Sequence, residues 1–335
     1  MNKPRTALSM SAAAAAAVFR SRSLAALREV CDLAPLPALD DLSSDRARDV
    51  LADVEILVTS WGCPRLDESV LASAPRLKAV VHAAGSVQGH VTDACWDRGV
   101  EVSSAAAANA LPVAEYTLGM ILLHGKQVLE RARDFRRTRQ RGHWLGVPYD
   151  VGNYRSTVGI LSASLIGRRV IELLRPFDHE VLLYDPYITE AEVAELGVER
   201  VELPELFARS DLLSIHAPLL PATRGLVSRE LLGMMRPGAV LINTARGAVV
   251  DQDALMDAVS AGCIRAVLDV TEPDALPADH PLWGCTDVLL TPHLAGSQGN
   301  EWERLSDMAV SEVARWAAGD GFAHPVRRER LAFQA

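Results

Sequence analysis

The sequence predicts an α/β protein of two doubly wound parallel-sheet domains, Rossmann-like or flavodoxin-like, with a cleft between them. Three observations favour this fold class. Short runs rich in Val, Ile and Leu alternate with amphipathic segments, as in a parallel sheet covered by helices on both faces. The 335 residues exceed one typical core, so two domains are expected. Charged residues directly follow several of the runs, where such sheets bind ligands.

The first half of the chain alternates strand and helix. The alanine run from Ala12 to Ala17 is short and is followed by Arg20 and Arg22, so it indicates a helix start and not a signal-peptide core. From Leu111 one long helix is expected through residue 133, with Pro112 in its first turn, where proline is tolerated. The basic segment after it is interpreted as a solvated helix end and loop. Strands are expected at 54–60, 78–85 and 99–105, and a helix at 91–99.

A second alternating series follows and predicts a parallel sheet covered on both faces. Its strands are expected at 157–161, 180–185, 211–218, 239–245, 265–270 and 287–292. Its helices are expected at 165–177, 188–197, 203–210, 228–238 and 251–263, and a last helix at 299–319.

Composition excludes several classes of protein. The net charge of -9 gives no global attraction for nucleic acid or an anionic membrane. The five cysteines are odd in number and form no CxxC pair, which fits reduced thiols in a cytoplasm better than disulfides or a zinc site. No apolar stretch is expected to be long enough to span a bilayer. The histidines outside the charged blocks show no metal-ligand spacing, so no catalytic metal is expected: His82, His90, His124, His143 and His280.

The turn after strand 157–161 stands where a dinucleotide-binding G-x-G-x-x-G turn would lie. Only its third glycine, Gly167, is present, and Ser162 and Ser164 replace the other two. Each serine adds a Cβ and also a hydroxyl that could donate to a phosphate oxygen. Asp185 ends the next strand and could accept hydrogen bonds from ribose and repel a 2′-phosphate, which favours NAD over NADP. The alternative makes Asp185 a turn residue before Pro186.

Three charged groups follow the last strands. They are Arg246, the acidic pair Glu272 and Asp274, and His293. A cation, a carboxylate and an imidazole that converge at one sheet edge can bind an anionic substrate and move a proton. The sequence therefore predicts an active site there.

The order of the blocks resembles the D-isomer-specific 2-hydroxyacid dehydrogenases. The blocks are VGI and IG around the turn, YDP, HAP with TR-x-L, M-x-PGA-x-LINTARG-x-VVD, LDV-x-EP and TPH-x-AGS, within residues 75–320. PVAEYTLGMIL (112–122) is similar to that family's hinge helix. The resemblance implies an NAD-dependent oxidoreductase that transfers a hydride between nicotinamide and C2 of a small 2-hydroxy or 2-keto acid. It would be D-isomer specific, work mainly as a reductase, and act on glyoxylate, hydroxypyruvate or a similar acid.

The resemblance also implies roles for the charged groups. Arg246 would bind the substrate carboxylate and polarise the carbonyl, and His293 would be the general acid for reduction. The family commonly has Glu where this chain has Asp274, whose side chain reaches about 1.5 Å less. We expect Asp274 to orient His293, with Glu272 as the substitute. Asp269 would bind the nicotinamide carboxamide, or alternatively cap the next turn.

The remaining assignments also come from the resemblance. Backbone N–H groups at Ala84, Gly85 and Ser86 would bind substrate together with Arg246, although a plain turn is the alternative there, and Asn109 would help to close the cleft. The substrate domain would comprise 1–106 and 300–335 and the NAD-binding domain 107–299, with a homodimer formed through the latter. The cofactor-binding residues would be Ser164, Leu165, Ile166, Gly167, Asp185, His216, Ala217, Pro218, Thr223, Thr244, Ala245, Arg246, Asp269, His293 and Gly296.

Two other functions stay open. A non-catalytic NAD(H)-binding regulatory or partner protein of the same fold would explain the serines in the turn and the short Asp274, but binding alone does not require both Arg246 and His293. An enzyme of another class could use bound NAD without net oxidation. Formate or phosphite dehydrogenases fall within the same resemblance, but nothing in the sequence singles out either substrate.

Overall fold

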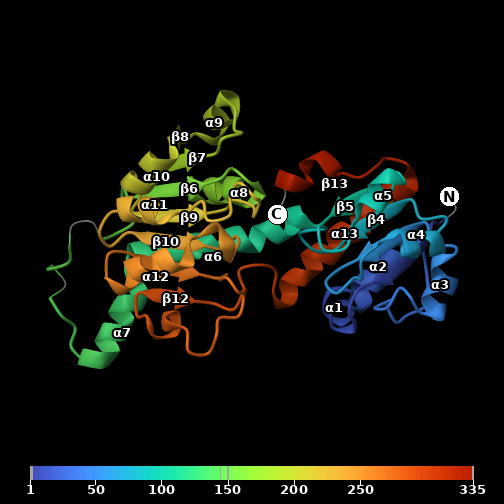
Figure 1. The fold of residues 1–335 in the computed structure, drawn as a ribbon, viewed down its shortest axis with the longest axis horizontal. Coiled ribbons are helices and arrows are strands. Elements are labelled where there is room, and N and C mark those ends of the chain that lie inside the picture. Colours follow the sequence, from blue (N-terminus) through green and yellow to red (C-terminus); the bar gives the residue numbers. More distant parts are fainter. Residues whose placement is uncertain (1–2, 144, 149–150, 334–335) are drawn as a thin grey trace. The chain divides into compact units, whose positions relative to one another are not determined.

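The computed structural model describes residues 3–143, 145–148 and 151–333. The chain divides into two compact units, one made of residues 1–110 and 297–335 and the other of residues 111–296. The sequence had placed these boundaries after residues 106 and 299. Each unit is built around its own largely parallel sheet with helices on both faces, which confirms the predicted fold class (Figure 1).

The sheet of the first unit has the order β13-β5-β4-β3-β1-β2. Its neighbours pair in parallel, except that β13 pairs antiparallel with β5. Side chains of successive strand residues point to opposite faces of the sheet. Leu57 belongs to the apolar cluster on one face, and Ile56 and Val58 belong to the cluster on the other. The strands are β1 (Arg5–Ser9), β2 (Asp32–Leu33), β3 (Ile56–Thr59), β4 (Ala79–His82), β5 (Glu101–Ser104) and β13 (Pro325–Val326).

Helices cover both faces of that sheet. The first apolar cluster takes side chains from α3, α4 and α5, and the second from α1, α2 and α13. The alanine run forms α1, whose N-cap Ser11 accepts a hydrogen bond from Ala14 N, as the predicted helix start requires. The helices are α1 (Ala12–Val18), α2 (Ser21–Val30), α3 (Asp45–Leu51), α4 (Glu68–Ser73), α5 (Asp93–Asp97) and α13 (Trp302–Ala318).

The sheet of the second unit is entirely parallel, with the order β12-β11-β10-β9-β6-β7-β8. All six predicted strands form, and only the short β8 was not predicted. The strand order reverses between β6 and β9, which is where sheets of this kind bind ligands beyond their carboxyl ends. The strands are β6 (Thr157–Leu161), β7 (Glu180–Tyr184), β8 (Glu199–Arg200), β9 (Leu212–Ile215), β10 (Val240–Asn243), β11 (Arg265–Leu268) and β12 (Val288–Leu290).

Helices again cover both faces. One apolar cluster packs α10, α11 and α12 on the sheet, and the other packs α6, α8 and α9 (Figure 1). These helices fall within the predicted segments and are shorter than expected by a few residues at their ends, where helices fray. They are α8 (Leu165–Leu174), α9 (Glu190–Leu196), α10 (Leu203–Arg209), α11 (Arg229–Met234) and α12 (Gln252–Ser260).

The single long helix expected from Leu111 is instead two helices, α6 (Ala106–Gly125) and α7 (Val128–Thr138). The preceding alanines extend α6 toward the N-terminus, so Pro112 lies inside the helix and not in its first turn. A Cβ on Gly125 would lie 2.0 Å from Asn153 Oδ1, and Asn153 Nδ2 donates to Leu122 O (3.0 Å). Packing of this distant segment therefore ends α6, and Gln127 adopts φ 52° before α7 begins.

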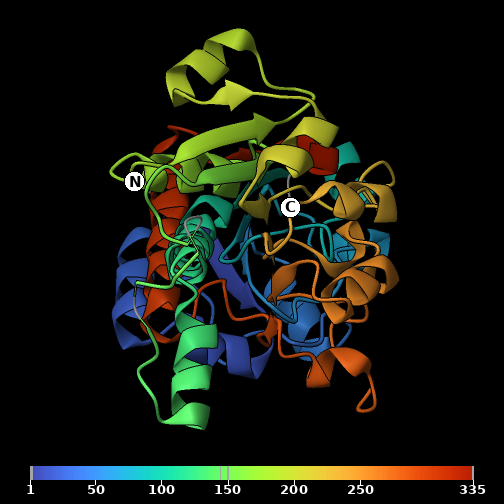
Figure 2. The ribbon, with the colours of Figure 1, turned by 90° about the vertical axis from the view of Figure 1, so that its left-hand side faces the viewer.

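Two features of these helices bear on partners. By length and composition alone α6 could span a membrane, so the expectation that no stretch was long enough is wrong by that measure. Its Ala114 and Ile121 are nevertheless fully buried in the core of the second unit, and core helices pass the same test. By contrast, α7 has no buried residue and projects from the rest of its unit (Figure 2).

Candidate functional site

The predicted catalytic groups follow three neighbouring parallel strands. Arg246 comes after β10, Asp274 after β11 and His293 after β12. Because β10, β11 and β12 are adjacent and parallel, their carboxyl ends lie along one edge of the sheet. The structure therefore places all three groups at the same edge of the second unit.

Arg246 is held through its backbone and keeps most of its guanidinium available. Asn243 Nδ2 donates to Arg246 O (3.0 Å), and Arg246 Nη1 donates to Ala245 O (2.7 Å). The turn that follows packs closely on the backbone after β11. Only glycine fits at position 247, since a Cβ there would lie 2.1 Å from the carbonyl carbon of Thr271. Burial lowers the pKa of Arg246, and the nearby Asp274 carboxylate partly offsets this. An arginine stays charged under these conditions, so the site holds a permanent cation.

His293 lies beside Asp274, and not beside Glu272. Its Nδ1 is 4.0 Å from Asp274 Oδ1, which is within ion-pair range but longer than a hydrogen bond. The two side chains are 54% and 78% exposed, so tight packing does not hold them at this distance. The backbone of Glu272 pairs with Gln252, with distances of 2.9 and 3.0 Å. The 4.0 Å distance between Asp274 and His293 is consistent with an aspartate side chain, which is one carbon shorter than a glutamate.

Asp269 organises the loop that carries His293. Its carboxylate is 2% exposed and accepts hydrogen bonds from Thr291 Oγ1 (2.6 Å), Leu294 N (2.9 Å) and Ala295 N (2.9 Å). His293 N also donates to Asp269 O (3.0 Å), and His293 adopts φ 52°. This geometry matches the alternative interpretation of Asp269 as a cap on the next turn. With about four acceptor positions on a carboxylate, roughly one is left for a ligand.

Tyr116 also lies at this edge, which the sequence did not predict. Its hydroxyl, on α6, lies 3.0 Å from Thr291 Oγ1, which in turn donates to Asp269. Burial raises the pKa of Tyr116, so it is a neutral donor at ordinary pH. No spacing rule pairs residues 116 and 291, and only the folded structure reveals this chain of hydrogen bonds.

The predicted phosphate turn joins β6 to α8 as expected, but its serines have different partners. Ser164 is the N-cap of α8, and its Oγ accepts from Gly167 N (3.3 Å), which leaves its own proton free. Ser162 Oγ instead donates to Asp185 Oδ2 (3.1 Å). Of the two hydroxyls expected to be able to reach a phosphate, only that of Ser164 remains available. A Cβ on Gly167 would lie 2.1 Å from Ser162 O, so this glycine is required for packing.

His216 is a second buried polar group beside this turn. It follows β9, is 3% exposed, and its Cβ would lie 3.5 Å from a Cβ on Gly167. Burial lowers its pKa to about 3, so the ring is neutral. Neither ring nitrogen has a partner within the described part of the chain. An orphaned buried ring, a helix N-terminus, a free serine proton and the Asp185 carboxylate together fit an anionic dinucleotide.

The remaining cofactor candidates lie in the same loops. Thr223 closes the turn after Ala217 and Pro218, with its hydroxyl accepting from Leu220 N (2.8 Å) and donating to Pro218 O. Thr244 and Ala245 are buried after β10, and Thr244 Oγ1 lies 3.4 Å from Thr117 Oγ1. Leu165 and Ile166 form the first turn of α8, and Gly296 ends the unit.

The substrate-loop candidates lie in the first unit, after β4. Ala84 is buried and Ser86 is exposed, with Ser86 Oγ accepting from Gln88 N (3.4 Å). A Cβ on Gly85 would meet Asn109 Nδ2 at 3.6 Å, an ordinary contact, so internal packing does not demand glycine there. Asn109 Oδ1 accepts from Ser297 N (3.1 Å) and so joins the two segments that lead out of this unit.

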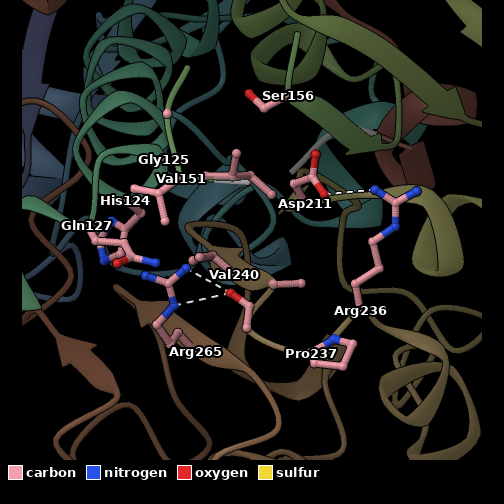
Figure 3. A pocket seen from close by; sticks show the side chains of 14 residues that line it. His124, Gly125, Gln127, Val151, Ser156, Asp211, Arg236, Pro237, Val240 and Arg265 are labelled. Atoms are coloured by element: carbon pink, nitrogen blue, oxygen red, sulfur yellow. Dashed lines mark hydrogen bonds and ion pairs between the residues drawn. The ribbon is translucent and has the colours of Figure 1, made fainter. Parts of the chain in front are cut away.

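A polar cavity of about 200 Å³ lies at the opposite, amino-terminal ends of β9, β10 and β11 (Figure 3). Its charged groups are already paired: Arg236 with Asp211 (2.8 Å), and Arg265 with Gly238 O (2.7 Å) and Glu130 (3.3 Å). As far as the described residues go, its lining shares none with the predicted site. This cavity is therefore separate from the candidate active site.

The family profile that matches this chain covers most of the second unit. Residues 118–295 match the profile described as "D-isomer specific 2-hydroxyacid dehydrogenase, NAD binding domain". A D-3-phosphoglycerate dehydrogenase of Mycobacterium bovis is 36% identical over 76% of this chain and 48% of its own length, so the chain spans about half of that relative. A glyoxylate reductase of Korarchaeum cryptofilum is 31% identical over 80% of this chain and 81% of its own.

A solved structure covers nearly the whole chain. The D-lactate dehydrogenase of Aquifex aeolicus, complexed with NAD and lactic acid, has a TM-score of 0.70 and 26% identity over 94% of this chain and 96% of its own. Both units described above thus have a counterpart in one known enzyme.

Proposed function

This chain belongs to the D-isomer specific 2-hydroxyacid dehydrogenase family, and from that premise we propose that it reduces a small 2-keto acid to the D-2-hydroxy acid with NADH. Glyoxylate, hydroxypyruvate or an acid of similar size is the proposed substrate. The observation that carries the proposal is the convergence of Arg246, Asp274 and His293 at the carboxyl ends of three adjacent strands.

Each of these side chains has a chemical task. The free part of the Arg246 fork binds the substrate carboxylate and stabilises negative charge that develops on the carbonyl oxygen. His293 donates a proton to that oxygen during reduction and removes it during oxidation. Asp274, 4.0 Å away, restricts the orientation of the ring.

The cofactor is NAD, in keeping with the family's NAD binding domain. When bound it supplies or accepts the hydride. The N-terminus of α8 and the free Ser164 proton would hold the pyrophosphate, and Asp185 would disfavour a 2′-phosphate. Asp269, through its remaining acceptor position, and Thr244 and Ala245 after β10 are proposed to contact the nicotinamide half.

The test is the loss of NADH absorbance with purified protein and a panel of 2-keto acids. We expect turnover with at least one small keto acid, and a loss of about 10²- to 10³-fold in kcat/KM for Arg246→Ala. Arg246→Lys is the matched control, since it keeps the charge and loses the planar fork, and it should recover part of the activity. Bound NADH with no turnover across the panel would favour the non-catalytic NAD(H)-binding alternative.

We also propose a cytoplasmic homodimer formed through the NAD-binding unit. The five cysteines are all unpaired, which fits a reducing compartment. α7 exposes Val128, Leu129 and Phe135, which a second copy would cover. Light scattering of the wild type should give twice the monomer mass. Phe135→Asp should lower the measured mass toward that of the monomer. A wild-type protein that is monomeric at micromolar concentration would contradict this.

A further inference from the structure

The two serines of the phosphate turn are not equivalent. Ser164 acts as a helix cap, whereas the Ser162 hydroxyl donates to Asp185 Oδ2 (3.1 Å). Ser162 also adopts φ 83°, the left-handed region that favours glycine. A serine held in a glycine conformation, with its hydroxyl bonded to the carboxylate proposed to bind ribose, calls for a functional explanation.

Asp185 has little accepting capacity left. A carboxylate offers about four acceptor positions. In this structure Ser162 Oγ (3.1 Å) and Ala163 N (2.8 Å) donate to Oδ2, and Tyr187 N (2.8 Å) donates to Oδ1. About one position remains, on Oδ1, and the residue is only 9% exposed. A ribose carries two neighbouring hydroxyls, so a second hydroxyl has no free acceptor.

Only one of the three internal donors can be given up. Ala163 N and Tyr187 N are backbone groups next to the ends of β6 and β7, and the ladder between these strands continues as Ser162 N donates to Tyr184 O (2.8 Å). Moving either would disturb the sheet. The Ser162 hydroxyl, by contrast, can rotate about its Cα–Cβ bond at little cost.

We propose that Ser162 sets the affinity of this chain for its dinucleotide, because its hydroxyl competes with the adenosine ribose for Asp185. The inference rests on the proposed NAD-binding function and deepens it. A dinucleotide either uses one ribose hydroxyl at Asp185 or breaks the Ser162 hydrogen bond. In both cases it binds more weakly than it would if the hydroxyl were absent.

The test compares NADH dissociation constants, measured by fluorescence titration and calorimetry, for the wild type and Ser162→Ala. This variant keeps the Cβ and removes only the hydroxyl, and we expect binding to be about three- to tenfold tighter. Ser164→Ala is the matched control and should bind more weakly, because it loses the cap of α8 and the free proton. Melting temperatures of both variants show whether the turn remains folded.

A second titration tests whether the tighter binding of Ser162→Ala depends on the hydroxyls of the adenosine ribose. With an NADH analogue that lacks the 2′-hydroxyl of the adenosine ribose, wild type and Ser162→Ala should bind within about twofold of each other. A gain that persists with the analogue would overturn the inference, as would equal or weaker NADH binding by Ser162→Ala while wild type still reduces keto acids. Absence of NADH binding in both proteins would contradict the inference and the proposed function together.

Discussion

At the scale of single residues, the site is defined by distance and charge. The 4.0 Å gap between His293 Nδ1 and Asp274 Oδ1 is too long for a hydrogen bond and short enough for attraction between charges. An attraction of this kind orients the His293 ring only loosely. The length of the acidic side chain should therefore set how well the general acid is placed for reduction.

Substitutions at Asp274 should change the rate of reduction in opposite directions. Asp274→Asn removes the charge attraction that orients the His293 ring, so kcat should fall about three- to tenfold. Asp274→Glu adds about 1.5 Å of reach, so a hydrogen bond can form and kcat should be kept or should rise. The measurement is kcat and KM for the keto acid that is reduced fastest.

The neighbouring carboxylate serves as the control for this series. Glu272→Gln should leave kcat unchanged, because the contacts that hold Glu272 run through its backbone. An unchanged kcat in both Asp274 variants, or a loss in Glu272→Gln of the same size as in Asp274→Asn, would remove Asp274 from its proposed role.

At the scale of secondary-structure elements, one chain of hydrogen bonds joins α6 to the loop after β12. Tyr116 on α6 contacts Thr291, Thr291 donates to Asp269, and Asp269 accepts from the backbone around His293. The loop that carries the general acid is thus positioned by a helix distant from it in sequence.

Tyr116→Phe removes the first contact of this chain. We expect kcat to fall about three- to tenfold with little change in KM, because one neutral hydrogen bond contributes about 1 kcal/mol to the placement of the loop. Thr117 lies next to Tyr116 on α6, and its hydroxyl is 3.4 Å from that of Thr244, which follows β10. Thr117→Val removes this contact and is the control for a general disturbance of α6. If Tyr116→Phe keeps wild-type kcat, or if only KM changes, the loop does not depend on Tyr116.

The elements also show what the sequence could and could not predict. Apart from the short β8, each strand of the second unit lies within its predicted range, because strands buried on both faces appear as continuous apolar runs. The end of α6 was missed, since it depends on Asn153 packing against Gly125, far away in sequence. For the same reason the sequence placed Arg246, Asp274 and His293 after their strands but could not foresee the partners of Ser162, Asp269 or Tyr116.

At the scale of the whole molecule, buried neutral histidines couple stability to pH. Burial lowers the pKa of His82 to about 3, with a further contribution from His90, and lowers those of His90 to about 4 and His216 to about 3. Thr59 Oγ1 lies 2.9 Å from His82 Nδ1 and 3.0 Å from His90 Nε2, so these two rings are tied together while neutral.

The free energy of unfolding should therefore fall as the pH drops below about 6.5, where the unfolded chain binds protons that the folded chain does not. At pH 5.5 each of these histidines should lower the free energy of unfolding by about 1.4 kcal/mol. Above pH 6.5 the rings are neutral in both states, and stability should be flat with respect to them.

Urea unfolding at pH 7.0, 6.0 and 5.5 tests this dependence. Carboxylates such as Glu192, whose pKa is lowered to about 2 by hydrogen bonds from Thr189 and Arg168, titrate below this window and do not obscure it. The slope of the unfolding free energy against pH gives the number of protons bound on unfolding, and His216→Asn should reduce that number by about one. Equal stability at pH 7.0 and 5.5 would show that the three rings are not buried neutral in solution.

The most direct test follows the hydride itself. The protein would be given NADH that carries deuterium at both C4 positions of the nicotinamide, together with the keto acid of three or more carbons that is reduced fastest, so that C2 of the product is a stereocentre. The product would be analysed by mass spectrometry and chiral chromatography. We predict a D-2-hydroxy acid with one deuterium at C2, formed in the same amount as the NADH consumed, and almost none with Arg246→Ala. NADH consumption without deuterium at C2 of the product, or an L-configured product, would show that the chain is not the proposed D-2-hydroxyacid dehydrogenase.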